Sequence, residues 1–235
     1  MNNGKKVMLY SGGLDCTLQS FLIKPDILLH MDIGGFYSEA EKKHLTTRKH
    51  FCDEIIIDDT LRIGDFEMET LYLPYRNLYF ILNALQIGEH IYLGFNESDV
   101  GPDKSQTFID KATAVIKEMT KEAWITPEHT NFTINAPFMH LTKGEMVAKC
   151  LYEGMTPEFI QSIRSCYDDE SEKGCGACSP CFSKLVALVV NDISIDGVFD
   201  VDPIPEFLKY VEERREEFKV KRAFKEFEKV YVILS

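Results

Sequence analysis

The sequence has no apolar run long enough to cross a membrane. A membrane helix needs about 20 consecutive apolar residues, and no stretch of the 235 residues approaches that length. The N-terminus also lacks the charged segment followed by an apolar segment that marks a secretory leader. No internal repeat or low-complexity tract is present. These absences argue against a membrane protein, and we expect a cytoplasmic one.

An excess of positive charge is also missing. Lys and Arg number 26 against 38 Asp and Glu, which gives a formal net charge of -12 at pH 7. Proteins that bind nucleic acid without regard to sequence depend on a summed positive field that attracts phosphates. We therefore expect no broad nucleic-acid binding, although the composition leaves room for a local basic patch.

Apolar runs of strand length alternate with segments of helical spacing. The runs lie at residues 7–10, 26–32, 54–58, 91–96 and 133–137, and we expect helices at residues 16–23, 38–52, 78–87 and 106–123. Three consecutive isoleucines at positions 55–57 predict a third strand that is buried on both faces. Such alternation is typical of right-handed βαβ units. We predict an α/β fold with a doubly wound parallel sheet.

The first predicted strand ends in a glycine turn that opens a helix. Residues 7–17 read Val-Met-Leu-Tyr-Ser-Gly-Gly-Leu-Asp-Cys-Thr. The two glycines have no Cβ to block a ligand from the backbone, and they reach backbone angles closed to other residues. The N–H groups of the loop and of the first helical turn can then surround an anion. We predict a pyrophosphate site made of Ser11, Gly12, Gly13, Leu14, Asp15, Cys16 and Thr17.

This loop lacks the marks of two common nucleotide loops. It does not end in Gly-Lys-Ser/Thr, and it has no third spaced glycine of a dinucleotide fingerprint. Ser11, Asp15 and Thr17 suit a site that holds the pyrophosphate of ATP while its α-phosphorus is attacked. The pattern resembles that of the ATP-pyrophosphatases, also called adenine nucleotide α-hydrolases. A glycine-rich turn that binds nothing is the alternative.

Further candidates follow the carboxyl ends of the predicted strands, where α/β sheets bind ligands. Asp32 precedes a Gly-Gly pair that either leaves room for adenine or ribose or forms only a turn. Arg76 and Asn77 stand at the start of a helix, where donors point toward a ligand; a surface arginine is the alternative. The acidic loop after the fourth strand could hold a metal or the amino edge of a base, or be simply solvated; its candidates are Glu97, Asp99 and Asp103.

Lys143 lies in the first turn of a helix that Thr142 and Glu145 are expected to cap. A cation is unusual there unless an anion is near, because the helix dipole is positive at that end. We expect Lys143 to meet a phosphate or a substrate carboxylate. The predicted catalytic residues are therefore Ser11, Asp15, Arg76 and Lys143. The predicted substrate contacts are Arg76, Asn77, Glu97, Asp99 and Asp103, and Asp32 joins the loop as a predicted nucleotide contact.

Four of the seven cysteines are crowded together with the spacing Cys-x8-Cys-x2-Cys-x2-Cys. An odd total and this crowding fit a reduced compartment and a metal site better than disulfides. Four thiolates fill a tetrahedral shell around Zn²⁺ and leave no position for an activated water, so we predict a structural zinc. An iron–sulfur cluster and free core thiols are the alternatives. The predicted ligands are Cys166, Cys175, Cys178 and Cys181.

Together, the loop and the cysteine cluster resemble the 7-cyano-7-deazaguanine synthase family over most of residues 5–190. Residues 73–77, Leu-Pro-Tyr-Arg-Asn, are similar to that family's Val-Pro-Gly-Arg-Asn. Residues 96–99 with 102–103, residues 136–139 with Lys143, and residues 165–167 also match. We predict a nucleotide-binding α/β domain over residues 1–150 and a helical region with a zinc knuckle over residues 151–235, forming one compact unit. The apolar side chains of residues 203–235 could pack on the domain or on a second subunit, and we expect a homodimer.

The resemblance implies a reaction. In that family the carboxylate of 7-carboxy-7-deazaguanine is adenylated with Mg-ATP and pyrophosphate is released. Ammonia then displaces AMP to give an amide, and a second adenylation dehydrates the amide to the nitrile. ATP, Mg²⁺ and a structural Zn²⁺ are the implied cofactors, and queuosine and related 7-deazapurines the implied pathway. The residues agree, because making an acyl-adenylate needs neutralised phosphate charge and positioning more than a protein nucleophile.

Two segments depart from the family's pattern. Residues 32–37 read Asp-Ile-Gly-Gly-Phe-Tyr where the family has Asp-Tyr-Gly-Gln-Arg-His, and the acidic loop lacks the family's Ser-Gly-Tyr ahead of residue 102. Both lie where substrate is expected, so three alternatives stay open. One is a ligase that joins the adenylated deazaguanine to another amine, such as a protein amine in an antiviral defence system, without the nitrile step. The others are a tRNA-modifying ATP-pyrophosphatase and a non-enzymatic zinc protein.

Overall fold

The computed structural model describes the chain except for residues 1–3, 47–50, 53, 100, 122–130 and 215–221. In this part of the chain five parallel strands form one sheet in the order β3-β2-β1-β4-β5. The first strand lies at the centre, and the chain winds to one edge and then to the other, which is the predicted doubly wound topology. The strands are β1 (Lys6–Leu9), β2 (Ile27–Met31), β3 (Ile55–Asp58), β4 (His90–Tyr92) and β5 (Thr133–Asn135).

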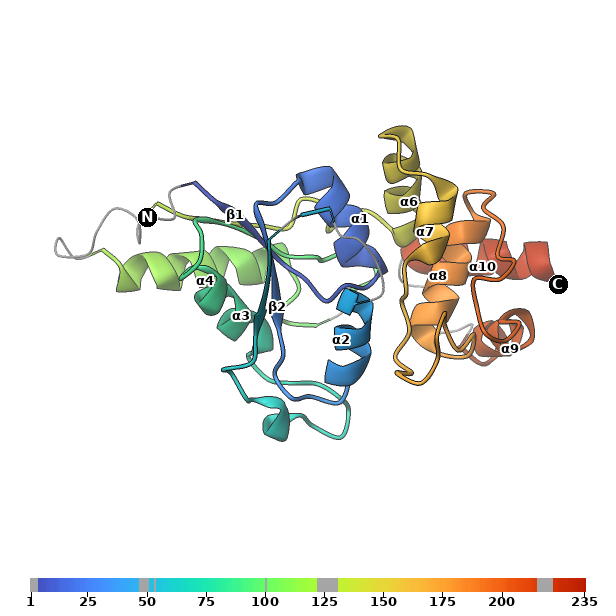
Figure 1. Ribbon diagram of the computed structural model, residues 1–235, viewed down its shortest axis with the longest axis horizontal. Coiled ribbons are helices and arrows are strands. Elements are labelled where there is room, and N and C mark those ends of the chain that lie inside the picture. Colours follow the sequence, from blue (N-terminus) through green and yellow to red (C-terminus); the bar gives the residue numbers. More distant parts are fainter. Residues whose placement is uncertain (1–3, 47–50, 53, 100, 122–130, 215–221) are drawn as a thin grey trace.

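Helices cover both faces of the sheet (Figure 1). On one face α3 (Arg76–Ala84) and α4 (Gln106–Met119) pack in a core that includes Val7 of β1. On the other face α1 (Leu14–Ile23) and α2 (Ser38–Thr46) lie over a core that includes Met8. Successive side chains of a strand point to opposite faces, so the unbroken apolar run of β1 is explained by burial on both sides. A short 3-10 helix, η1 (Gly64–Phe66), follows β3.

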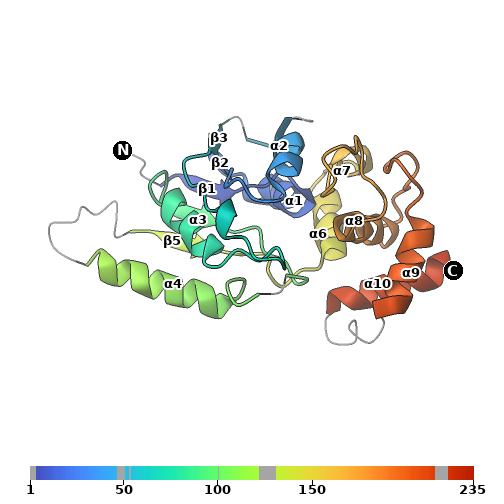
Figure 2. The same ribbon diagram turned by 90° about the horizontal axis from the view of Figure 1, so that it is seen from below.

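The five C-terminal helices are α6 (Lys143–Tyr152), α7 (Pro157–Ser162), α8 (Ser179–Val189), α9 (Ile204–Arg214) and α10 (Arg222–Leu234). They lie on the side of α1 away from the sheet, where α6 packs on α1, α8 packs on α6, and α10 packs on α8 and α9 (Figures 1 and 2). Their common apolar core also contains Leu14 and Leu18 of α1. The predicted boundary at residue 150 falls inside the first of these helices and stays a prediction. Within the described residues, no helix has both the length and the apolar character needed to cross a membrane.

Some local predictions are wrong. The third strand is not buried on both faces, because it lies at the edge of the sheet and Ile57 is 55% exposed. The helix expected over residues 38–52 does not reach its predicted end, since Phe51 and Cys52 are not helical and the chain turns there into β3. α4 ends at Met119, where the Thr120 hydroxyl donates to the carbonyl of Ile116 (3.0 Å). The predicted end at residue 123 lies outside the described residues.

Candidate functional site

Gly12 gives the loop after β1 its shape. Its φ is +75°, and a Cβ at this position would lie 2.7 Å from the Cβ of His44, so glycine alone fits. The buried Thr17 side chain donates to the carbonyl of Gly13 (2.8 Å), and the Thr17 N–H also bonds to that carbonyl (3.1 Å). The N–H groups of residues 14–16 therefore precede the hydrogen-bonded ladder of α1. Thr17 shapes the loop from inside, and the backbone donors at the start of α1 are placed for an anion.

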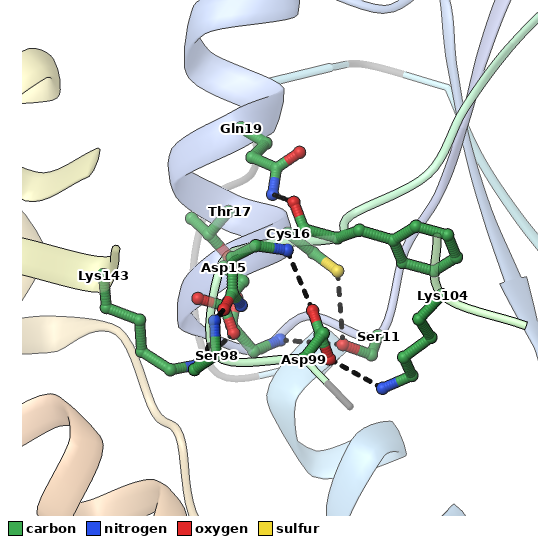
Figure 3. Close-up of polar contacts among 12 residues, drawn as sticks. Ser11, Asp15, Cys16, Thr17, Gln19, Ser98, Asp99, Lys104 and Lys143 are labelled. Atoms are coloured by element: carbon green, nitrogen blue, oxygen red, sulfur yellow. Dashed lines mark hydrogen bonds and ion pairs between the residues drawn. The ribbon is translucent and has the colours of Figure 1, made fainter. Parts of the chain in front are cut away.

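Asp15, in the first turn of α1, forms an ion pair with Lys143 of α6 (Figure 3). Burial lowers the pKa of Lys143, but the charge of Asp15 and its hydrogen bond outweigh this and raise the pKa, so the ammonium group persists at neutral pH. The second carboxylate oxygen, Oδ1, is buried and has no hydrogen-bond partner among the described residues. This oxygen is open to a ligand that the protein itself does not supply.

A cavity of about 230 Å³ opens at the carboxyl ends of β1 and β2. Side chains from several places in the sequence line it, which is the convergence expected at this edge of a doubly wound sheet. Ser11 and Cys16 come from the loop, Arg76 and Asn77 from the start of α3, and Asp99 from the acidic segment after β4. The structure therefore brings five of the predicted site residues to one cavity.

The other predicted residues do not line this cavity; they include Asp15 and Lys143 of the ion pair, the remaining loop residues, and three acidic residues that have partners elsewhere. Asp32 pairs with Lys42 of α2 (2.8 Å). Burial raises the pKa of Asp32, but hydrogen bonds from Lys42, from the backbone of Gly34 and from Ser38 lower it further than burial raises it. Glu97 accepts from the backbone N–H of Ala223 in α10 (2.8 Å). The backbone carbonyl of Asp103 accepts from the side chain of Asn77 (3.1 Å), so the acidic segment is held against α3.

The sequence reasoning missed Glu41 and Lys104. Glu41 of α2 lines the cavity, and burial raises the pKa of its carboxyl group to about 7, although the nearby Arg76 lowers it. Lys104 also lines the cavity and pairs with Asp99 (2.6 Å; Figure 3). Both residues follow a predicted turn at the carboxyl end of a strand. That position was the available signal.

Cys16 lies inside the loop, with its sulfur against the backbone of Gly94. A Cβ at residue 94 would lie 2.9 Å from this sulfur, and Ser11 donates a hydrogen bond to it (3.5 Å; Figure 3). Burial raises the pKa of the Cys16 thiol, so the protonated form predominates at neutral pH. A protonated thiol is a poor nucleophile.

The helix α6 begins with the predicted capping box. The Glu145 N–H donates to the Thr142 hydroxyl (3.1 Å), and the Glu145 carboxylate accepts from the Thr142 N–H (2.9 Å). The same hydroxyl donates to Glu226 of α10 (2.6 Å). Through Glu226 and through Glu97, α10 is tied both to the start of α6 and to the segment after β4. Lys143 thus lies in a helical turn that is held by the Glu145 capping box and by Glu226 of α10.

The four predicted metal ligands come together between α7 and α8, around the start of α8. Their sulfur atoms all lie within 4.8 Å of one another, with 3.8 Å between Cys166 and Cys178 and 3.5 Å between Cys178 and Cys181. A tetrahedral zinc with Zn–S bonds of about 2.3 Å places sulfurs about 3.8 Å apart. Hydrogen bonds from Cys178 and then from Cys181 lower the pKa of Cys166, which favours the thiolate that metals bind. The fourth ligand is Cys175, and the cluster could bind a metal such as zinc.

The parallel sheet, the glycine turn after β1 and the four-cysteine cluster together define an α/β protein with a candidate ligand site at the carboxyl ends of its strands and a candidate metal site. The family model described as "Queuosine biosynthesis protein QueC" matches residues 41–191. The chain therefore belongs to the QueC family.

Curated relatives carry the name 7-cyano-7-deazaguanine synthase. The one from Campylobacter curvus is 31% identical over 214 aligned residues, which cover 77% of this chain and 91% of the relative. The one from a Nitratiruptor species is 28% identical over 215 residues, covering 77% and 92%. The one from Aliarcobacter butzleri is 26% identical over 216 residues, covering 77% and 89%. The similarity spans most of each protein.

Proposed function

We propose that this chain is an ATP-dependent carbon–nitrogen ligase that adenylates the carboxylate of 7-carboxy-7-deazaguanine and passes the acyl group to ammonia. The observation that carries the proposal is the shared cavity, in which Ser11 and Cys16 of the phosphate loop face the same space as Arg76 and Asn77. Membership of the QueC family and the names of the relatives support the substrate and a place in queuosine biosynthesis.

The chemistry needs no protein nucleophile. A carboxylate oxygen of the substrate attacks the α-phosphorus of ATP, and the bond to the pyrophosphate breaks. Ammonia then adds to the acyl carbon, AMP leaves and a proton is lost, which gives the amide. In a second round the amide oxygen attacks the α-phosphorus of a second ATP and pyrophosphate leaves; loss of AMP and two protons then gives the nitrile. The loop donors at the start of α1 and the Lys143 ammonium stabilise the charge that develops on the phosphates.

Two metals fit the residues that are present. Mg²⁺ prefers oxygen ligands, and Asp15 Oδ1 is a buried oxygen without a partner among the described residues. When bound there, Mg²⁺ would neutralise charge on the phosphate oxygens of ATP. The four cysteines would hold Zn²⁺ with no open position, so its role would be structural. Reduced thiols favour the cytoplasm, where glutathione keeps cysteines reduced.

The test is a reconstituted reaction with ATP, Mg²⁺, 7-carboxy-7-deazaguanine and ammonium. We expect pyrophosphate release that depends on the deazaguanine, and a product with the mass of the amide and then of the nitrile. Leaving out each component in turn assigns the steps. Pyrophosphate release that is equal with and without the deazaguanine would contradict the proposal.

A second candidate keeps the adenylation and changes the amine. The residues that depart from the family's pattern between positions 32 and 37 line the cavity, namely Ile33, Gly35, Phe36 and Tyr37. A changed wall in this place favours a ligase that gives the activated acid to a different amine, such as one on a protein, and stops at an amide. With ammonium as the sole amine, such an enzyme would release pyrophosphate and accumulate no nitrile. Product mass separates the two candidates.

A tRNA-modifying activity is less well supported. The net charge of -12 opposes broad RNA binding, and the raised pKa of the Cys16 thiol makes it unsuited to carrying a persulfide. We also propose that the protein forms a homodimer. Analytical ultracentrifugation tests this, and a mass of one chain, 27.0 kDa, would contradict it.

A further inference from the structure

Two opposite charges face the cavity without pairing with each other. Glu41 reaches it from α2 and Arg76 from the start of α3. Each side chain interacts electrostatically with the other, yet among the described residues neither side chain makes a hydrogen bond or an ion pair. Both residues are half-buried, and charged groups that are shielded from water normally have such partners. This arrangement points to partners that come with a ligand.

The carboxylates around Glu41 differ from it in this respect. Asp32, after β2, is held by Lys42 at 2.8 Å. Glu67, after η1, accepts from the backbone N–H of Phe36 at 2.8 Å. The negative charges of Asp32 and Glu67 and the positive charge of Arg76 all act on Glu41. Of these three carboxylates, Glu41 is therefore the one that the protein leaves for a ligand.

A carboxylate beside a guanidinium matches one kind of heterocycle edge. A carboxylate accepts two parallel N–H bonds, and a guanidinium donates to a neighbouring acceptor. The pyrimidine edge of a guanine-type base presents two adjacent donors, N1–H and the 2-amino group, next to the acceptor O6. Adenine presents one donor beside one acceptor on this edge and leaves one carboxylate oxygen unmatched. The pair of side chains therefore fits a guanine-type base better than the base of ATP.

We infer that Glu41 and Arg76 are the residues that read the base of the substrate: Glu41 accepts from N1–H and the 2-amino group, and Arg76 donates to O6. This inference rests on the proposed function and adds the determinant of its substrate specificity. In 7-carboxy-7-deazaguanine the carboxylate is on the five-membered ring, on the side of O6 and opposite the 2-amino group. Binding the edge at Glu41 and Arg76 leaves the carboxylate free to face Ser11 and the phosphate loop in the same cavity.

The test compares Glu41→Gln with the wild type in the pyrophosphate-release assay. Glutamine keeps the size of the side chain but presents an N–H₂ group where the substrate also presents a donor. We expect the KM for 7-carboxy-7-deazaguanine to rise about 10- to 100-fold, as for loss of a charged hydrogen-bond partner, while the KM for ATP is unchanged. Glu118→Gln is the matched control, because Glu118 is an exposed carboxylate on α4 that pairs with Lys121 and does not line the cavity.

A substrate analogue without the 2-amino group makes the test specific. If Glu41 contacts that group, the wild type binds the analogue more weakly than the substrate. The Glu41→Gln substitution should then weaken binding of the analogue less than it weakens binding of the substrate, because contacts that share a partner are not additive. Glu41→Asp, which keeps the charge, should recover part of the affinity. The melting temperature and the KM for ATP report whether each variant is folded.

The outcomes separate the inference from the proposed function. A normal KM of Glu41→Gln for the deazaguanine, with an active wild type, overturns the inference and leaves the proposed function standing. A rise in the KM for ATP alone assigns Glu41 to adenine and also overturns it. If the wild type releases no pyrophosphate with the deazaguanine, the proposed function fails, and calorimetric titration with 7-deazaguanine still decides the inference. The inference is supported if the wild type binds 7-deazaguanine and Glu41→Gln does not. It is overturned if the wild type does not bind 7-deazaguanine.

Discussion

Lys143 and Asp15 form an ion pair although 128 residues separate them in the sequence. The pair joins the first turn of α6 to the first turn of α1, so the helical region is electrostatically linked to the phosphate loop. Both side chains are largely shielded from water. We expect this ion pair to stabilise the folded protein and also to position Lys143 and Asp15 at the candidate site.

Removal of the cation should therefore affect both properties. We expect Lys143→Met to lower stability by about 1–3 kcal/mol, because it leaves a shielded carboxylate without its partner, and to lower pyrophosphate release by about 100-fold. Lys149→Met, on the exposed side of the same helix, should change neither. Thermal melts and the pyrophosphate assay give the two readouts. A double variant with Asp15→Asn measures the coupling, and additive effects would show that the pair does not matter.

The pKa of Glu41 predicts an effect of pH on stability. Burial is the main reason that this pKa rises from 4.5 to about 7; Arg76 opposes the rise, and Asp32 and Glu67 add to it. The folded protein therefore binds more protons than the unfolded chain between these values, and its stability falls as pH rises through that window. Glu41→Gln lacks this loss. We expect it to melt a few degrees above the wild type near pH 8 and at the same temperature near pH 5, and equal melting at both would contradict the raised pKa.

Loss of metal should loosen the helical region. Cys166 and Cys181 are buried members of the core that also contains Leu14 and Leu18 of α1. We expect one zinc per chain by elemental analysis, and loss of zinc with a clearly lower melting temperature in Cys181→Ser. Cys52→Ser, outside the cluster, should keep its zinc. A Cys181→Ser protein with full zinc content would contradict the four-cysteine site.

Alanine substitutions at Gly12 and Gly154 separate the cost of a steric clash of the new Cβ from the cost of backbone strain. Both have positive φ, but a Cβ at Gly12 would meet His44 at 2.7 Å, whereas a Cβ at Gly154 would have nothing within 4 Å. Gly154→Ala should cost about 1–2 kcal/mol from the backbone alone. Gly12→Ala should cost more and should also abolish ATP binding, because the loop must move. Denaturation curves and nucleotide titration measure this, and equal costs for the two variants would contradict the steric argument.

The backbone of Tyr75 adopts a left-handed conformation that is strained for tyrosine but not for glycine. Its φ is +64°, and its side chain is 71% exposed, so little packing compensates. We expect Tyr75→Gly to raise stability by up to about 1 kcal/mol, since the relief of strain exceeds the added chain entropy. Tyr152→Gly, an exposed position at the end of α6, should lower stability instead. Stability measurements on both variants test this, and a loss at both positions would show that Tyr75 makes a stabilising contact.

Residue 75 also shows what a sequence pattern can reveal. The family's Val-Pro-Gly-Arg-Asn has glycine there, and the left-handed backbone at Tyr75 is the conformation that glycine adopts without strain. The glycine turn after β1, the cysteine spacing and the capping box of α6 were equally predictable, whereas phosphate binding at the turn stays a prediction. Their signals lie within a few consecutive residues, and their geometry follows from local chemistry.

The features that the sequence did not reveal depend on neighbours that are distant in the chain. Ile57 is exposed because β3 takes the edge of the sheet, which no property of three isoleucines shows. Glu41 lines the cavity because α2 lies beside the ends of β1 and β2; the sequence shows that it follows a predicted turn but not that it faces a cavity. Glu97 was predicted as a substrate contact, yet it accepts a hydrogen bond from Ala223, 126 residues away. Such pairings become visible only when the fold is known.

The contacts of α10 connect the end of the polypeptide to its beginning. Glu226 bonds to Thr142 at the start of the turn that contains Lys143, and Lys143 forms an ion pair with Asp15 beside the glycine turn. Displacing α10 would thus disturb the loop after β1, although the two lie far apart in the sequence.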